Sequence, residues 1–155
     1  MIDNNISPFI KWAGGKRQLL PYIKEKMPLK YKNYIEPFIG GGAVLFGITP
    51  DKAIINDINK ALINVYNQIK YNPIELMDFL SKIDIQSDVE PKEYYYKKRE
   101  IFNDKIMKSE YDIELASLFI YLNKHCFNGL YRVNSKGLFN VPFNNSLAKS
   151  FNEDN

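Results

Sequence analysis

The sequence predicts an α/β protein that begins with half of a doubly wound nucleotide-binding fold and continues into a helical region. Two short apolar segments near the N-terminus have the character of buried strands, and a glycine run lies between the first of them and a helix. An acidic residue ends the second segment, and another helix follows it. From residue 73 to residue 123 helical periods replace the strands. This order of strand, glycine turn, helix, strand, acid and helix indicates the fold class.

The N-terminal part is expected to contain two strands among three helices. The expected elements are, in order, a loop over 11–15, a helix over about 16–27, a strand over 34–38, a helix over 43–46, a strand over 53–55 and a helix over about 59–70. Pro21 is placed in the first turn of its helix, where its missing N–H costs little. Leu19, Leu20 and Ile23 of the same helix lie at helical spacing and are expected to share its inner face.

The remainder is expected to be helical up to residue 123 and turn-rich after it. The expected helices cover about 73–83, 91–108 and 113–124. After residue 123 the helical period is lost, and Asn-Gly, Lys-Gly and Asn-Asn pairs predict a loop or hairpin region. Four aromatic residues in this region predict that it is ordered: Phe127, Tyr131, Phe139 and Phe143.

Composition limits the class of protein. The 155 residues suffice for one compact domain, and shares of 45% hydrophobic and 25% charged residues are those of a globular protein. No segment has the roughly 20 uncharged apolar residues of a membrane span, and the N-terminus lacks a signal peptide's apolar core, so we expect a cytoplasmic protein without membrane contact.

Cys126 is the single cysteine, which excludes an internal disulfide. With His125, the single histidine, it provides too few ligands for zinc, so no metal site is expected.

The distribution of charge is more informative than the net charge of +3. Seven cations and one acid lie between Lys11 and Lys32, and no acid lies between Leu115 and Asn152. Two basic zones that exclude acids indicate a phosphate-bearing partner. Two solvated faces would explain the same pattern.

The glycine run Gly40–Gly42 and the acid Asp57 together indicate a nucleoside site. Glycines between a strand and a helix let the backbone approach a ligand closely, and Asp57 stands where a carboxylate accepts both ribose hydroxyls. Without a longer G-x-G-x-x-G match, a smaller nucleoside such as S-adenosylmethionine fits better than a dinucleotide. A tight structural turn is the alternative explanation.

A second glycine pair, Gly14-Gly15, precedes Lys16 and raises the question of a phosphate-binding loop. The G-x-x-x-x-G-K-[ST] pattern is not satisfied, because the upstream glycine is absent and Arg17 replaces the hydroxyl residue. We interpret the segment as a lid in which Trp12 packs on the cofactor and Lys16 pairs with the cofactor's carboxylate. Packing of Trp12 in the core is the alternative.

Four blocks of the sequence resemble successive motifs of the Dam-type (D12 class) DNA adenine methyltransferases. The blocks, in order, are residues 11–16 (KWAGGK), 36–42 (EPFIGGG), 56–59 (NDIN) and 122–132 (LNKHCFNGLYR), the last continuing to 139–143 (FNVPF). The resemblance implies a partial Rossmann-like S-adenosylmethionine-dependent methyltransferase fold with an inserted helical DNA-recognition domain. Residues 1–72 would form the N-terminal half of the cofactor-binding domain, and residues 73–155 a helical target-recognition domain with a hairpin loop.

The resemblance also implies an activity and a set of site residues. The activity is transfer of a methyl group from S-adenosylmethionine to the exocyclic amine of adenine in double-stranded DNA, at GATC, alone or within a restriction-modification system. The implied cofactor-binding residues are Trp12, Lys16, Phe38, Gly40, Gly42 and Asp57. The implied DNA-binding residues are Lys11, Phe127, Asn128, Leu130, Arg132 and Pro142.

The DNA-binding positions have distinct implied roles. Lys11 and Arg132 match guanine contacts, and a bidentate contact to O6 and N7 suits an arginine. Phe127 matches an aromatic wedge beside the flipped adenine. Asn128 and Leu130 match neighbouring positions that hold the orphaned partner base and the flanking pairs, and Pro142 matches a thymine-methyl contact. A surface salt bridge is the alternative role of Arg132.

The family's catalytic block, Asp-Pro-Pro-Tyr, does not occur in the sequence, so no catalytic residue is assigned. That block holds the adenine amine and stacks on the flipped base. We therefore expect the chain alone to be inactive, and a complementing C-terminal segment that carries the block is an expected partner. The alternative is a non-catalytic fragment that binds DNA or cofactor, or one half of a split methyltransferase. A truncated gene or a fragment would explain the missing block equally.

Overall fold

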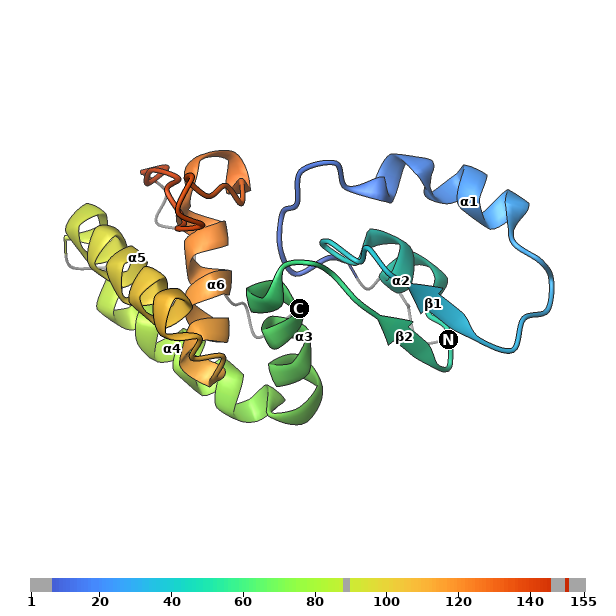
Figure 1. Ribbon diagram of the computed structural model, residues 1–155, viewed down its shortest axis with the longest axis horizontal. Helices are drawn as coiled ribbons and strands as arrows, with labels where there is room; N and C mark the ends of the chain where they lie inside the picture. Colours follow the sequence, from blue (N-terminus) through green and yellow to red (C-terminus); the bar gives the residue numbers. More distant parts are fainter. Residues whose placement is uncertain (1–6, 88–89, 146–149, 151–155) are drawn as a thin grey trace. The chain divides into compact units, whose positions relative to one another are not determined.

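The computed structural model describes residues 7–87, 90–145 and 150. Its chain divides into two compact units, the first ending at Ile58 and the second beginning at Asn59 (Figure 1). The expected domain boundary was at residue 72, and the helix between these two positions packs with the second unit, chiefly against its last helix. The mixture of helices with a small parallel sheet confirms the predicted α/β class.

The first unit is a β-α-β arrangement preceded by a helical segment. Its elements are the 3-10 helix η1 (Lys16–Leu19), α1 (Leu20–Lys26), β1 (Tyr34–Glu36), α2 (Ala43–Ile48) and β2 (Ala53–Ile55). The two strands are parallel, with Ile35 opposite Ile54. Helix α2 connects them, as parallel strands require a crossover connection. The predicted order of strand, glycine turn, helix and strand is confirmed.

Local sequence explains how these helices begin and end. Pro21 lies in the first turn of α1, as predicted, where no intrahelical N–H donor is needed. Gly42 precedes α2 with a φ of 78°, and Thr49 ends that helix with a φ of 50°. Both residues are in the left-handed region that interrupts a helix.

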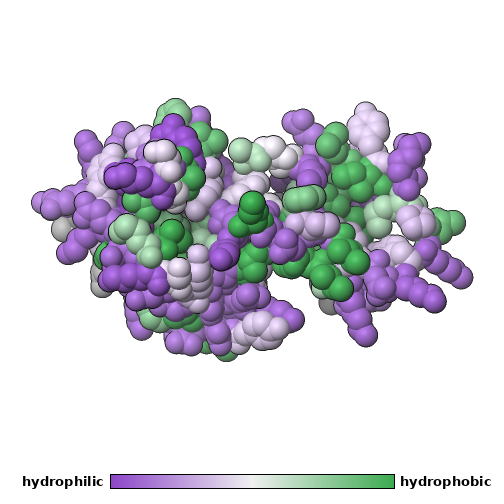
Figure 2. All heavy atoms as spheres, in the orientation of Figure 1, coloured by the Kyte–Doolittle hydropathy of each residue, from purple (hydrophilic) through white to green (hydrophobic). Residues whose placement is uncertain are grey.

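The expectation that both strands are buried is wrong for one face of the sheet. Ile35 and Ile54, which are paired across the strands, are 59% and 63% exposed. Leu19, expected on an inner helix face, is 54% exposed. The small core of this unit includes Ile10, Ile39 and Val44. Because Ile35 and Ile54 are exposed, no described element covers the face of the sheet on which they lie. Figure 2 shows apolar side chains at the surface of this unit.

The second unit is helical. Its elements are α3 (Lys60–Tyr71), α4 (Pro73–Ser87), α5 (Pro91–Lys108), α6 (Ile113–His125) and the 3-10 helix η2 (Phe127–Gly129). Helix α6 packs against α3, α4 and α5, and its residues from Leu115 to Asn123 are all buried. A helix that is buried all round needs partners on every side, and three neighbouring helices supply them.

The ends of α3 and α6 are set by side-chain caps. The Oδ1 atom of Asn59 accepts a hydrogen bond from the amide of Leu62, and the Oδ1 atom of Asp112 accepts one from Leu115. Each cap satisfies an amide that has no partner within its helix. These caps determine where the two helices begin.

The segment after α6 is a hairpin, as the turn residues predict. Antiparallel bridges join Val133 to Phe139 and Cys126 to Phe143. The turn between the first pair has Gly137 at a φ of 75°, and the Oδ1 atom of Asn134 accepts hydrogen bonds from the amides of residues 136 and 138. The hairpin is thus closed by its own turn chemistry.

The described part of the chain has no helix that is both long and apolar enough to span a membrane. Within residues 7–87, 90–145 and 150, no group of three or more His, Cys, Asp or Glu residues is arranged to hold a metal ion.

Candidate functional site

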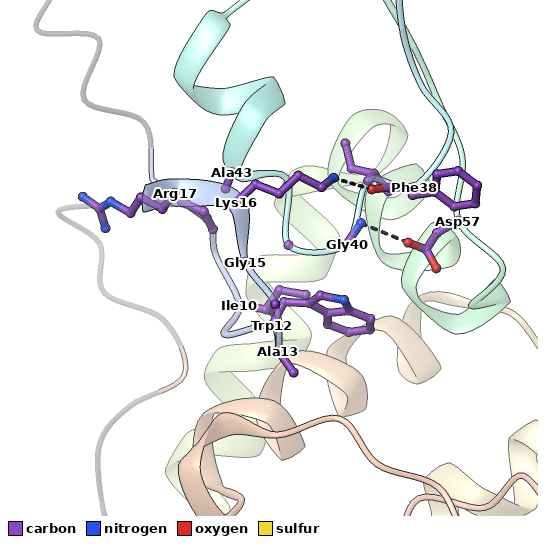
Figure 3. A pocket seen from close by; sticks show the side chains of 14 residues that line it. Ile10, Trp12, Ala13, Gly15, Lys16, Arg17, Phe38, Gly40, Ala43 and Asp57 are labelled. Atoms are coloured by element: carbon purple, nitrogen blue, oxygen red, sulfur yellow. Dashed lines mark hydrogen bonds between the residues drawn. The ribbon is translucent and has the colours of Figure 1, made fainter. Parts of the chain in front are cut away.

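A cavity of about 230 Å³ lies in the first unit beside the turn that joins β1 to α2 (Figure 3). Ligands of α/β proteins bind at this position, beyond the carboxyl ends of parallel strands. Residues from three separate parts of the sequence line the cavity: Pro8, Ile10, Trp12, Ala13, Gly14, Gly15, Lys16, Arg17, Phe38, Ile39, Gly40, Gly41, Ala43 and Asp57. The fold therefore brings the first three sequence blocks together.

The glycine turn forms one wall of the cavity and packs on Trp12. Gly40 has a φ of 52°, and a Cβ atom at this residue would lie 2.8 Å from Cδ1 and 3.0 Å from Nε1 of Trp12. A Cβ at Gly41 would lie 3.1 Å from the Cβ of Trp12. The indole thus occupies the space that side chains on the turn would fill. Trp12 is half-buried and lines the cavity, so it is both packed and available to a ligand.

Asp57 faces the glycine turn from the end of β2. Its Oδ2 atom accepts a hydrogen bond from the amide of Gly40 at 3.0 Å (Figure 3). This bond holds a carboxylate against the left-handed residue of the turn. A hydrogen-bond acceptor with negative charge is thereby fixed in the wall of the cavity.

Lys16 provides a cation beside the same turn (Figure 3). Its Nζ atom donates to the carbonyl oxygen of Phe38 at 2.7 Å and to Oε1 of Glu36 at 3.2 Å. Glu36 is 7% exposed, and its other oxygen accepts from the hydroxyl of Tyr34 at 2.7 Å. Burial and the bond to Glu36 raise the pKa of Tyr34 above its ordinary value. Glu36 thus stays paired although it is buried, as a charge at such a site must be.

The cavity contains five of the six predicted cofactor residues. Trp12, Lys16, Phe38, Gly40 and Asp57 line it. The sixth, Gly42, does not line it but caps α2. The sequence-based interpretation missed Glu36, although an acidic residue inside an apolar strand was a signal that it has a partner.

Five of the six predicted DNA-binding residues lie together in the second unit, on η2 and the hairpin. The amide of Phe127 donates to the carbonyl oxygen of Pro142 at 2.8 Å, which joins the two ends of this loop. Phe127 is 52% exposed, and Asn128 is exposed with a φ of 55°. Leu130 is half-buried, and the side-chain amide of Asn123 donates to the carbonyl oxygen of the adjacent Gly129 at 3.0 Å. The sixth residue, Lys11, belongs to the first unit.

Arg132 is exposed on the hairpin and bonds to Asn140. Its Nε atom donates to Oδ1 of Asn140 at 2.9 Å, and its Nη2 atom lies 3.5 Å from the carbonyl oxygen of the same residue. Within the residues that the structure describes, Arg132 forms no salt bridge. The alternative role of Arg132 as a surface ion pair therefore has no support in the described residues.

Comparison with known proteins shows which proteins the chain is similar to. The family model for the D12 class N6 adenine-specific DNA methyltransferase matches residues 12–155. The chain is 48% identical over 139 residues to the type II methyltransferase M1.LlaDCHI of Lactococcus lactis subsp. cremoris, which covers 90% of the chain and 48% of that relative.

Two further relatives match at similar levels. Type II methyltransferase M.MjaIII of Methanocaldococcus jannaschii is 43% identical over 165 residues, covering 97% of the chain and 56% of the relative. DNA adenine methylase of Haemophilus influenzae is 42% identical over 147 residues, covering 95% and 50% respectively. The chain thus spans about half the length of the curated relatives that it matches.

Proposed function

The chain belongs to the D12 class of N6 adenine-specific DNA methyltransferases, and we propose that it serves in methyl transfer from S-adenosylmethionine to the exocyclic amine of adenine in double-stranded DNA. The proposed target is GATC. In this proposal residues 1–72 belong functionally to a Rossmann-like cofactor-binding domain, and residues 73–155 form an inserted helical domain that reads the target. Because the relatives are about twice as long, the activity is proposed for the whole protein.

One observation carries the proposal: a single cavity is lined by an aromatic ring, an ammonium group and a carboxylate around a glycine turn. This set fits a nucleoside that carries an amino-acid tail. S-adenosylmethionine supplies the electrophilic methyl group. Asp57 is proposed to accept the ribose hydroxyls, and Lys16 to pair with the carboxylate of the tail. Gly40 lines the cavity and Gly42 caps the helix that follows it, and this glycine turn is proposed to lie beneath the tail, with Phe38 and Trp12 covering it.

The second unit supplies the proposed DNA contacts. Phe127 would wedge into the base stack beside the extruded adenine, with Asn128 at the partner base. Leu130 and Pro142 would contact flanking bases, and Arg132 would bind a guanine. Lys11 is proposed to contact a second guanine. The exposure of Phe127 and Arg132 supports this role, because an apolar wedge and a base-reading arginine must both be accessible.

Catalysis is proposed to need a group that these 155 residues do not contain. The amine of adenine must be held in line with the methyl group, and the Asp-Pro-Pro-Tyr block that would hold it is absent from the sequence. We therefore expect a complementing C-terminal segment to be required.

Names of relatives include both type II methyltransferase and DNA adenine methylase, so the proposal includes enzymes inside and outside restriction-modification systems. The proposed location is the cytoplasm, because the proposed substrate is DNA inside the cell.

Methyl transfer to DNA tests the catalytic part of the proposal. Tritiated S-adenosylmethionine and unmethylated GATC DNA are incubated with the chain alone and with a polypeptide that carries the missing block. We expect no incorporation by the chain alone and incorporation with both polypeptides. No incorporation in either case would favour a non-catalytic binding fragment. Turnover by the chain alone would contradict the assignment of the missing block.

Cofactor binding tests the cavity itself. Asp57→Ala is expected to weaken binding of S-adenosylhomocysteine by about 10- to 100-fold, which corresponds to the loss of hydrogen bonds to a charged group. Asp57→Asn keeps an acceptor for the amide of Gly40 and separates loss of charge from damage to the turn. Asp51→Ala, an exposed acid before β2, is the matched control. Calorimetry that shows equal affinity for Asp57→Ala and the original chain would place the cofactor elsewhere.

A further inference from the structure

We propose that Asn140 is a positioning residue that orients Arg132 for guanine recognition, an inference that rests on the proposed DNA-reading role of Arg132. The Oδ1 atom of Asn140 accepts from Nε of Arg132 at 2.9 Å, and its carbonyl oxygen lies 3.5 Å from Nη2. Both contacts are on the same edge of the guanidinium group. One residue thus occupies the side of Arg132 that includes Nε.

The orientation of these contacts determines which donors face outward. A guanidinium group has five N–H donors in a fixed plane. Asn140 engages the edge that Nε and one N–H of Nη2 form. The end edge, formed by N–H groups of Nη1 and Nη2, is a different edge of the same plane. Two parallel N–H groups at the end of an arginine match the O6 and N7 acceptors of guanine. Asn140 therefore selects end-on presentation of Arg132 over side-on presentation.

Helix α5 fixes the strand on which Asn140 lies. The side-chain amide of Asn103 donates to the carbonyl oxygen of Phe139 at 3.0 Å, and the amide of Phe139 donates back to Asn103 at 2.8 Å. On the other side of Asn140, the hydroxyl of Tyr95 donates to the carbonyl oxygen of Val141 at 2.9 Å. Phe139 and Val141 are 3% and 1% exposed. Because side chains alternate along an extended strand, Asn140 is turned to the opposite face.

The strand that carries Arg132 is fixed as well. The ring of Tyr131 stacks on Phe119 of α6 with 5.1 Å between ring centroids. The amide of Asn140 donates to the carbonyl oxygen of Arg132 at 3.2 Å. Both partners of the Arg132–Asn140 pair are thus held by the helices behind them. An arginine that is oriented before binding loses less conformational freedom when it meets a base.

DNA binding tests the proposal through base discrimination. The affinities of the chain for a GATC duplex and for the same duplex with 7-deazaguanine at both guanines are compared by fluorescence anisotropy. Arg132→Ala and Asn140→Ala are each expected to lower the preference for guanine by about five-fold, because a bidentate base contact is lost or misaligned. Asn140→Asp retains the acceptor and is expected to retain the preference, although its added charge lowers affinity for both duplexes. Asn72→Ala, an exposed asparagine after α3, is the matched control.

The outcomes separate this inference from the proposed function. A preference that Arg132→Ala leaves unchanged would refute the proposed guanine reading by Arg132, and this inference with it. A preference lost in Arg132→Ala but retained in Asn140→Ala would overturn the positioning role alone. Thermal unfolding of the Asn140 variants shows whether the fold is intact.

A second measurement examines the free chain. The Nε–H proton of Arg132 is expected to exchange with water more slowly in NMR spectra than that of the exposed Arg17, and Asn140→Ala is expected to remove the difference. Equal exchange of the two protons in the original chain would also overturn the proposal.

Discussion

Substitution of Gly40 by alanine tests the packing of the glycine turn on Trp12. The new Cβ would lie 2.8 Å from Cδ1 and 3.0 Å from Nε1 of the indole, and Gly40 has a φ of +52°. Contacts of this length require the ring or the turn to move. The left-handed backbone adds a separate penalty for any residue with a side chain.

Two control substitutions separate the backbone penalty from the contact penalty in the expected loss of stability. Gly14→Ala, at a φ of +71° with no atom within 4 Å of the new Cβ, measures the backbone penalty, about 1–2 kcal/mol. Gly41→Ala measures the contact alone, because its Cβ would lie 3.1 Å from the Cβ of Trp12; overpacking of this kind costs about 1–3 kcal/mol. Gly40→Ala combines both effects, so we expect the free energy of unfolding of the first unit to fall by about 2–5 kcal/mol.

The fluorescence of Trp12 provides the assay. Trp12 is the single tryptophan of the chain, so its emission during urea unfolding reports on the first unit. Gly40→Ala is also expected to shift the emission in the folded state, since the indole is displaced from the turn. An equal loss of stability in Gly40→Ala and Gly14→Ala, with unchanged emission, would refute the packing of Trp12 on Gly40.

Two further predictions concern the second unit. Tyr95→Phe removes the buried hydrogen bond to the carbonyl of Val141, which keeps only its longer bond from Nη1 of Arg99 at 3.3 Å. The free energy of unfolding measured by circular dichroism should therefore fall by about 1 kcal/mol, and no loss would mean that the bond from Arg99 suffices. Burial acts to raise the pKa of Asp112, but the hydrogen bond from Lys105 lowers it below its ordinary value. A depressed carboxyl pKa stabilises the fold above about pH 4, and this contribution is lost as pH falls through the lowered pKa. Lys105→Met should therefore weaken the acid dependence of stability below pH of about 4, and an unchanged pH profile would contradict this assignment.

Local signals in the sequence were sufficient for the order of the helices and strands, but not for every boundary: the helix expected to end at 83 continues to Ser87, and the strand expected over 34–38 ends at Glu36. Pro21, the caps Asn59 and Asp112, and the turn residues after α6 act within a few residues of their own positions, so the elements that they bound are readable in order. Most residues that line the candidate cavity were also predictable from the sequence, because the residue types of its three sequence blocks are distinctive. The burial of individual positions was less predictable. Apolar spacing indicated that Leu19 and Ile54 face a core, but spacing does not show whether another layer covers that face.

The sequence by itself determined the family, the order of the helices and strands, and the residues proposed to bind cofactor and DNA. Only the tertiary structure showed that Trp12 fills the space above Gly40, that Glu36 pairs with Lys16, and that Asn140 engages the edge of Arg132. Each of these contacts joins residues that are 8 or more positions apart in the sequence. Their distances depend on how the strands, turns and helices between them pack, and neither periodicity nor composition contains that information.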